Sequence, residues 1–216
     1  MIRRTSRTFC LLALAVGPLA FAQAPKPAAD AIPSSFRAFV ATDDRFEKGS
    51  PRNRADKMHC LVVDNALNPV VAVFSRLPPM VGDDKPTANP EVAKLASKLN
   101  ELVTDKELKA VRFGAFVVFL TLGKEYPEDD KRDAAAKQAR DLSSQLKTLG
   151  VPFALAAGKS EAVTEWAIGD KDTLTVVFYR EMKTLQKWTF TAEKPLGDDD
   201  VKAIAAAVEK ELRAKK

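Results

Sequence analysis

The sequence predicts an α/β domain in which a mixed sheet is flanked by helices on both faces. From Pro69 onward, short apolar runs alternate with longer segments whose apolar residues recur at helical spacing. Several of the short runs are apolar throughout, which is typical of strands that helices cover on both sides. The last two strand-like runs flank a short turn and precede a final helix, so an antiparallel pair should lie beside the parallel strands.

Residues 1–22 have the pattern of a secretory signal peptide. Arginines within residues 1–8 precede an unbroken apolar run at 9–16, and Ala20-Phe21-Ala22 offers the small-x-small pattern that signal peptidase requires. The apolar stretch is shorter than the roughly 20 residues of a membrane-spanning helix. We expect cleavage before Gln23, export to the periplasm or the extracellular space, and no transmembrane anchor after cleavage. An uncleaved membrane anchor is the alternative.

Residues 23–35 are rich in alanine and proline and carry no periodic apolar pattern, so we expect a flexible leader. The folded body, a single domain, should span residues 36–216. It opens with an N-terminal β-hairpin extension, in which the apolar runs at 36–40 and 58–63 pair. The segment 43–56 between these runs is rich in charged residues, and we expect a solvated, mobile loop.

The remaining elements follow in order along the chain. Pro90 fits the first turn of a helix, and Asn89 is a suitable cap. The stretch 113–122 is the most apolar of the mature chain and should be the central strand, while Gly150 is placed to end a helix. We therefore expect strands at 70–74, 113–122, 153–157, 173–179 and 185–191, and helices at 91–103, 130–149, 159–168 and 198–213.

Charge and composition exclude several functional classes. Loss of residues 1–22 removes Arg3, Arg4 and Arg7 but no acid, so the net charge falls from +5 to +2. A net charge so close to zero gives no indication of a basic surface for nucleic acid or anionic lipid. The sequence also contains no phosphate-binding glycine loop and no nucleophilic serine elbow.

The order of the predicted elements resembles that of thioredoxin-like proteins. The additional strand and helix before the final hairpin resemble the peroxiredoxin and alkyl hydroperoxide reductase branch, and the resemblance covers about residues 57–213. The stretch from His59 to Val71, HCLVVDNALNPVV, is also similar to one in exported bacterial thioredoxin-like proteins that carries two cysteines three positions apart. Here Cys60 occupies the first position and Val63 the second, so the motif is degenerate.

The resemblance implies that a reactive thiol would follow the first central strand, where amide groups at a helix start stabilise a thiolate. The corresponding segment, Ser75–Asp84, contains neither a cysteine nor the threonine that precedes the thiol in peroxidases. The cis-proline of thioredoxins would fall near Asp172 and is also missing. These differences predict a protein without dithiol oxidoreductase or peroxidase activity.

Cys60 is the only cysteine of the mature chain, because Cys10 lies within the signal peptide, so no internal disulfide can form. One interpretation is a reactive thiol that forms a mixed disulfide with an unknown protein partner, or a disulfide-linked homodimer. The other is a small, buried apolar residue in a strand. If His59 and Cys60 both lie in a strand, their side chains point to opposite faces, and His59 does not activate the thiol.

Other polar and aromatic residues favour structural roles. The acidic run 198–200 suits the start of a helix, and the segment 170–172 lacks the glycine and glutamate of a calcium loop. One histidine and one mature cysteine are too few for a zinc site, so we expect no metal and no cofactor. We expect Trp166, Trp188 and Tyr179 to pack in or beside the core, an aromatic ligand platform being the alternative.

The sequence therefore predicts an exported protein of thioredoxin-like fold that acts as a binding module. The alternative is a thiol-based redox protein that works through Cys60 and an intermolecular disulfide.

Overall fold

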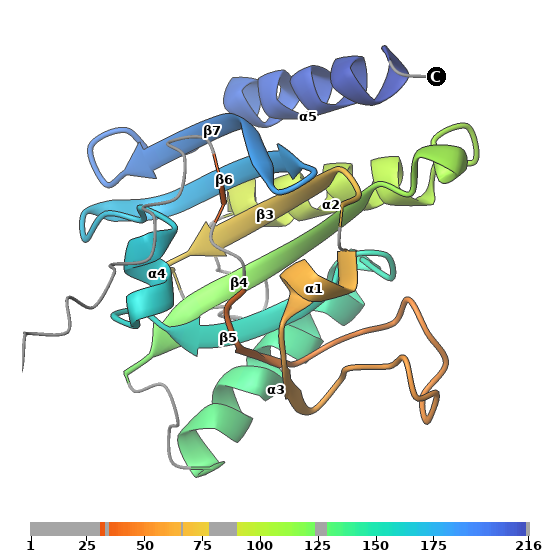
Figure 1. Cartoon of the computed structure of the whole chain (residues 1–216). Helices are drawn as coiled ribbons and strands as arrows, with labels where there is room; N and C mark the ends of the chain where they lie inside the picture. The colour runs from red at the N-terminus through yellow and green to blue at the C-terminus, as the bar shows by residue number, and fades with distance from the viewer. Residues whose placement is uncertain (1–30, 33–34, 66, 78–89, 124–128, 215–216) are drawn as a thin grey trace, which may run out of the picture.

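The computed structural model describes residues 31–32, 35–65, 67–77, 90–123 and 129–214. Seven strands form one mixed sheet in the order β2-β1-β5-β4-β3-β6-β7 (Figure 1). The strands are β1 (Ala38–Val40), β2 (Lys57–His59), β3 (Val70–Ser75), β4 (Gly114–Leu122), β5 (Phe153–Ala157), β6 (Asp172–Arg180) and β7 (Lys183–Thr191). The helices are α1 (Leu61–Asn65), α2 (Pro90–Thr104), α3 (Asp129–Leu146), α4 (Glu161–Glu165) and α5 (Asp198–Arg213), with a short 3-10 turn, η1 (Lys109–Val111).

The centre of the sheet is parallel and its edges are antiparallel. β4 pairs in parallel with β3 on one side and with β5 on the other, and the helices α2 and α3 make the crossovers that parallel neighbours require. β6 pairs antiparallel with β3, and β7 with β6. The predicted central strand and the predicted final antiparallel pair are both confirmed.

Each face of the sheet has its own apolar cluster. One cluster joins β-strand side chains to α2, α3 and α5, whose buried residues include Leu95, Leu142 and Val208. The other lies under α1 and α4 and includes Leu61 and Trp166. Figure 1 shows α1 and α4 on the near side of the sheet and α2 behind it. Helices on both faces were predicted, and the structure confirms them.

The N-terminal hairpin is present, but its second apolar run divides into two elements. β1 pairs antiparallel with β2 and, on its other edge, with β5. The run at 58–63 leaves the strand after His59 and enters α1, where Leu61, Val62 and Asn65 turn their side chains inward. The interpretation of Cys60 as a strand residue is therefore wrong, because this residue lies between β2 and α1.

The charged segment 43–56 is not simply a solvated loop. Asp43 and Asn53 are both buried. The Asn53 side-chain amide donates hydrogen bonds to the carbonyl oxygens of Asp43, at 3.0 Å, and Phe46, at 2.8 Å. The expectation of solvation is wrong for these residues, because their polar groups find partners inside the loop itself.

Two predicted helices are shorter than expected. α3 ends at Leu146, since Lys147 adopts a left-handed conformation (φ 53°), and Leu149 is exposed. Gly150 therefore does not cap the helix; a Cβ there would lie 2.8 Å from the Val103 side chain, so close packing explains the glycine. The helix expected at 159–168 covers only the five residues of α4.

The folded body begins earlier than residue 36. Ala31 forms a bridge with Lys183, and Ile32 is buried against the cluster under α1 and α4, so both belong to the fold rather than to the leader. The predicted signal peptide, residues 1–22, and most of the leader lie outside the described residues. No helix in the described ranges is long and apolar enough to cross a membrane.

Candidate functional site

The resemblance to thioredoxin-like proteins implies a reactive thiol at the carboxyl end of β3. β3 ends at Ser75, and the start of α2 at Pro90 lies at this end of the strand. Of the segment Ser75–Asp84, the structure describes Ser75, Arg76 and Leu77, and the sequence of the remainder contains no cysteine.

Arg76 uses its guanidinium to join three loops at this end of the sheet. It donates to the Gly158 carbonyl oxygen at 2.7 Å, and from two nitrogens to the Gly169 carbonyl oxygen at 3.1 and 3.3 Å. The hydroxyl of buried Ser75 donates to the Leu77 carbonyl oxygen at 3.1 Å. These side chains therefore hold backbone segments together.

Asp172, where the cis-proline of thioredoxins would fall, is the first residue of β6. Its carboxylate accepts a hydrogen bond from the Gly169 backbone N–H at 2.7 Å. Asp172 and Arg76 thus hold the same short segment from opposite sides. The described residues contain no cis peptide bond.

Cys60 lies at the opposite end of β3. The carboxamide of Asn65, at the end of α1, lies against Gly114, the register partner of Val70 at the amino end of β3. Figure 1 shows α1 at this amino end and the arrowhead of β3 at the other. Since a strand rises about 3.3 Å per residue, the two ends of β3 are about 16 Å apart. Cys60 is therefore remote from the place where the fold would position a reactive thiol.

Cys60 is partly exposed and packs against the cluster under α1 and α4, next to Tyr179. Tyr179 is fully buried, and its hydroxyl has no hydrogen-bond partner among the residues that the structure describes. Burial raises the pKa of Tyr179 well above its usual range, and negative charge on Cys60 acts in the same direction. An unpaired hydroxyl thus lies in the same cluster as the thiol.

His59 does not serve Cys60 but joins an ionic cluster. We define the ionic cluster as Asp43, Arg45, Arg54, His59 and Asp64. His59 Nε2 lies 2.8 Å from Asp64 Oδ1, and Arg45 and Arg54 approach the same carboxylate at 3.6 and 3.5 Å. Arg45 also binds Asp43 through two hydrogen bonds, of 2.7 and 3.1 Å. The cluster ties the loop after β1 to α1.

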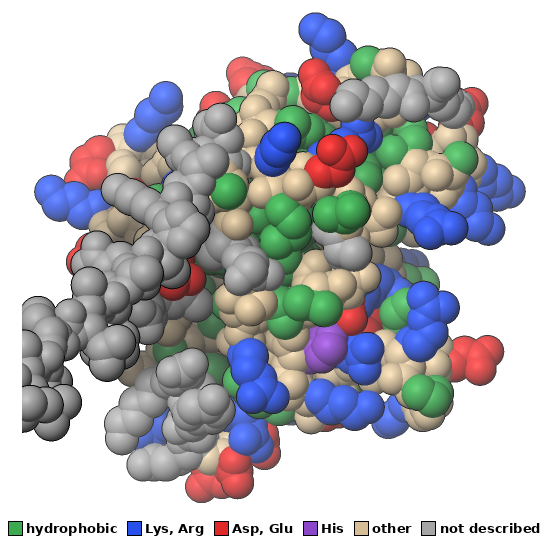
Figure 2. Space-filling view, viewed as in Figure 1, with side chains coloured by type: hydrophobic (Ala, Val, Ile, Leu, Met, Phe, Trp, Pro, Cys, Tyr) green, Lys and Arg blue, Asp and Glu red, His purple; other side chains and the backbone are tan. Residues whose placement is uncertain are grey.

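Exposed apolar side chains lie on and beside α1. Val63 is 59% exposed and Leu67 is 63% exposed, although both are large apolar residues. We call Cys60, Val63 and Leu67 the α1 patch. Figure 2 shows hydrophobic side chains gathered over and beside α1, next to the single histidine, drawn in purple. The sequence analysis missed this patch because it assigned Val63 to a strand.

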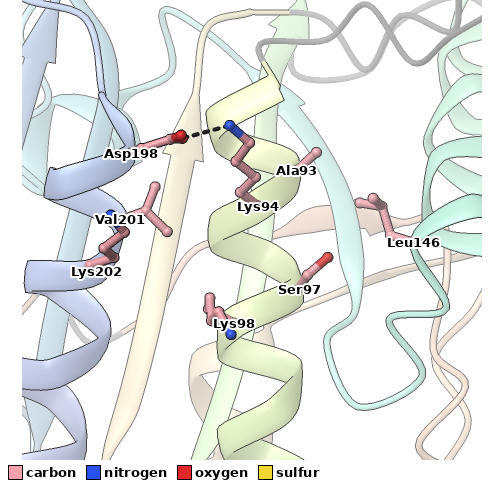
Figure 3. A pocket seen from close by; sticks show the side chains of 8 residues that line it. All are labelled: Ala93, Lys94, Ser97, Lys98, Leu146, Asp198, Val201 and Lys202. Atoms are coloured by element: carbon pink, nitrogen blue, oxygen red, sulfur yellow. Dashed lines mark hydrogen bonds and ion pairs between the residues drawn. The ribbon is translucent and has the colours of Figure 1, made fainter.

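A second apolar surface lies between α2 and α5. It is an open groove of about 330 Å³ with an apolar floor and a rim of ammonium groups (Figure 3). Lys94 on α2 is paired with Asp198 on α5 at 2.5 Å, and this hydrogen bond lowers the pKa of Asp198. The residues that line this α2–α5 groove are Ala93, Lys94, Ser97, Lys98, Leu146, Asp198, Val201 and Lys202.

The acidic run 198–200 has structural partners. Asp198 pairs with Lys94, Asp199 with Lys202 at 3.1 Å, and Asp200 accepts the Gly197 backbone N–H at 3.0 Å, which caps α5. Within the described residues, no three His, Cys, Asp or Glu side chains are grouped so as to hold a metal ion.

The aromatic residues lie where packing predicts them. Trp166 and Tyr179 are buried with ring centroids 6.0 Å apart, and Trp166 also contacts Phe36 and Phe74. Trp188 is half-buried against the cluster on the other face. All three expected packing residues therefore lie in or beside the core.

Comparisons with known proteins identify the fold and nothing finer. No protein-family model matches this sequence, and no curated protein sequence matches it. A cysteine-to-serine variant of peroxiredoxin Q from Xanthomonas campestris is similar in structure, with a TM-score of 0.51 and 11% identity over 82% of this chain and 91% of that one. A cysteine-to-serine variant of PrxQ from Xylella fastidiosa gives a TM-score of 0.50 and 8% identity over 84% of this chain and 94% of that one. Together with the strand order and the crossovers, these similarities show that the chain has a thioredoxin-like fold.

Proposed function

We propose that the protein is an exported binding module that uses a thioredoxin-like fold without dithiol-exchange or peroxidase activity. One observation carries this proposal: Cys60, the only cysteine of the expected mature chain, lies near the amino end of β3, whereas the fold would position a reactive thiol at the carboxyl end, and the two ends are about 16 Å apart. At the carboxyl end, Ser75 and Arg76 are engaged with backbone groups. Dithiol exchange also requires a second thiol to resolve the mixed disulfide, and the mature chain has none.

Two apolar surfaces support a binding role. The α2–α5 groove and the α1 patch both expose apolar side chains beside charged ones, which is the usual composition of a protein contact. The lining of the α2–α5 groove contains no cysteine and no histidine, and the α1 patch holds one thiol, that of Cys60. Binding therefore accounts for both surfaces.

Activity assays of the mature protein test the proposal. We expect no reduction of insulin disulfides in the presence of dithiothreitol, and no consumption of hydroperoxides, beyond the rate in buffer. A thioredoxin and a peroxiredoxin serve as positive controls in the same assays. A rate within ten-fold of either control would contradict the proposal.

A second candidate function rests on the α1 patch. Because Cys60 is partly exposed and lies beside the exposed apolar residues Val63 and Leu67, its thiol would be accessible to a disulfide of a partner protein docked on the α1 patch. Cys60 Sγ would form a bond to one partner sulfur, and the other sulfur would leave as a thiolate and take up a proton. The partner's disulfide is the oxidant, so electrons balance without a further reagent.

Titration of the native protein with a thiol reagent separates the two candidates. A thiol that reacts within seconds, together with a reductant-sensitive adduct or dimer on a gel, would support the second candidate. A thiol that reacts only after unfolding would dismiss it. Cys60→Ser is the control that must show neither reaction.

A further inference from the structure

β7 lies at the end of the sheet, and most of its residues are exposed. Among the described residues it pairs with β6 on one side, and on its other side only Lys183 has a partner, Ala31. The outward N–H and C=O groups of such an edge are a template for another strand. A natural protein normally covers or blocks an edge of this kind.

The N-terminal segment begins to cover this edge. Ala31 forms an isolated antiparallel bridge with Lys183, and the Ile32 backbone N–H donates to the Met182 carbonyl oxygen at 3.0 Å. Ile32 is buried against the cluster under α1 and α4. The chain is therefore fixed next to the first residue of β7, with antiparallel direction.

A groove continues from this bridge along β7. Its volume is about 330 Å³, and it lies between Ala31 and Ile32, the end of α4 and the strand residues that follow Lys183. In an antiparallel pair, each residue before Ala31 faces a residue after Lys183. The groove is lined by Ala31, Ile32, Glu165, Trp166, Ala167, Val177, Thr184, Leu185, Gln186 and Lys187.

We propose that residues 25–30, which precede the bridge and lie outside the described residues, pair antiparallel with the free edge of β7 and occupy this groove. The part of the leader nearest the fold would then be an eighth strand of the sheet, and it would fill the groove. This pairing does not depend on the proposed function.

The positions of the leader prolines fit this pairing. In an antiparallel strand every second residue turns its N–H toward the partner. Since Ile32 does so, Asp30, Ala28 and Lys26 would do so as well in a continuous strand, whereas Pro25 and Pro27 would fall at the positions whose N–H points away. Proline has no N–H and is tolerated in an edge strand only at such positions.

The groove also offers polar partners to the segment. With a side-chain period of two, Asp30 and Ala28 share the face of Ile32 and would lie over the groove. Lys187 brings an ammonium group to the groove wall, where it donates to the carbonyl oxygens of Trp166 and Ala167 at 3.3 and 2.8 Å. The Asp30 carboxylate is complementary to this charge.

Trp166 supplies an independent reason to expect an occupant. Its side chain is 4% exposed and lines the groove, yet its indole N–H has no acceptor. A buried donor without a partner costs about 1 to 3 kcal/mol. A carboxylate or carbonyl oxygen of the docked segment would remove this deficit.

Hydrogen exchange with matched proline variants tests the proposal. The chain beginning at Gln23 is compared with one beginning at Ala31, which keeps the bridge and Ile32. We expect the outward amides of residues 184–187 to exchange at least ten-fold faster in the shorter chain. Ala28→Pro should lose the same protection, because it removes an N–H that faces β7, whereas Ala29→Pro should keep it.

The outcomes are decisive in both directions. Equal exchange in all four proteins would overturn the proposal, as would equal effects of Ala28→Pro and Ala29→Pro. Protection that rises with protein concentration, together with a dimer mass in sedimentation, would overturn it in favour of a second copy on the edge. Protection that appears only when a synthetic strand-forming peptide is added would assign the groove to a separate partner instead.

Discussion

Asp43 shows how a single charged residue organises the segment between β1 and β2. Its side chain is completely buried, binds Arg45 through both carboxylate oxygens, and accepts the Arg54 backbone N–H at 3.0 Å. A buried carboxylate with three donors is stable only because the donors replace its water shell. The ionic cluster is therefore part of the fold.

Replacement of Asp43 should be costly. Asp43→Ala leaves the Arg54 amide and one side of Arg45 without an acceptor, so we expect a loss of about 2 to 4 kcal/mol in the free energy of unfolding by urea. Asp44→Ala is the matched control, because Asp44 is exposed, and it should change this quantity by less than about 0.5 kcal/mol. Equal losses in the free energy of unfolding for the two variants would contradict the structural role of Asp43.

Replacement of Tyr179 should stabilise the protein, whereas replacement of Asp43 should destabilise it. Because its buried hydroxyl has no partner, Tyr179→Phe removes a desolvated polar group and should raise the free energy of unfolding at neutral pH by about 1 kcal/mol. A loss of similar size would show that the hydroxyl has a partner. Urea unfolding at pH 7 measures the difference.

The same residue should make stability depend on alkaline pH. Burial raises the pKa of Tyr179 above its value of about 10 in an unfolded chain, so only the unfolded state releases this proton at first. This proton leaves the free energy of unfolding unchanged below pH 10 and lowers it above pH 10 by about 1.4 kcal/mol per pH unit, and Tyr179→Phe should remove this part of the slope. A Tyr126→Phe background leaves Tyr179 as the only tyrosine, so tyrosinate absorbance reports it directly. Tyrosinate formation near pH 10 in the folded protein would contradict the expectation.

The sequence predicts that Cys60 is the only thiol left after cleavage, but it does not predict the surroundings of Cys60. The neighbours of Cys60 and the carbonyl partners of Arg76 come from distant parts of the chain, 82 and 93 residues away for Arg76. Local periodicity carries no information about such contacts. The buried state of Asp43 was missed for the same reason, because a charged segment without a pattern looks solvated until its partners are known.

Among the elements, the end of β3 depends on one side chain. Arg76 connects β3 to the loops that follow β5 and α4, and a Cβ at Gly158 would lie 3.2 Å from the Arg76 guanidinium. The three hydrogen bonds are charge-assisted, and such bonds are stronger than those between neutral groups. Arg76 therefore holds three backbone segments together at this end of the sheet.

Removal of this side chain should loosen three loops together. Arg76→Ala should lower the free energy of unfolding by about 2 to 3 kcal/mol and speed amide exchange around Gly158 and Gly169. Arg37→Ala, which removes an exposed guanidinium near the start of the fold, is the control and should do neither. An unchanged exchange rate at both glycines in Arg76→Ala would show that these loops hold without the guanidinium.

Helices with a long, strongly periodic stripe were predicted closely, as were the short strands β3 and β5, whereas the short helices were not. α2 and α5 match because each buries one apolar face against the sheet. α1 was missed because five residues in an apolar run fit a strand as well as a helix turn. The end of α3 was misplaced because the left-handed Lys147, a residue type rare in that conformation, stops it before Gly150.

At the scale of the whole molecule, the sheet topology could be predicted from the sequence, because few arrangements of the strands satisfy the order of strands and helices along the chain. Parallel strands joined by helices must cross over in one hand, and the final two strands can only add antiparallel at an edge. The two peroxiredoxins compared above have a similar fold. Fold alone does not determine chemistry, so the position of the thiol within it is decisive.

Export of the protein is a prediction that concerns the whole molecule. If residues 1–22 are a signal peptide, the protein recovered after secretion should begin at Gln23 and carry one thiol. Intact-mass analysis with and without reductant reads both features in one experiment. A chain that retains Met1 would contradict export by cleavage, and a mass increase from oxidation that reductant reverses would favour the second candidate function.

The most direct test of the central claim compares mature wild-type protein with Cys60→Ser for transfer of electrons to insulin disulfides and to hydrogen peroxide. If the thioredoxin-like fold serves binding here, the two proteins should give the same rate, equal to that of buffer. Robust turnover by the wild-type protein that Cys60→Ser abolishes would contradict the account.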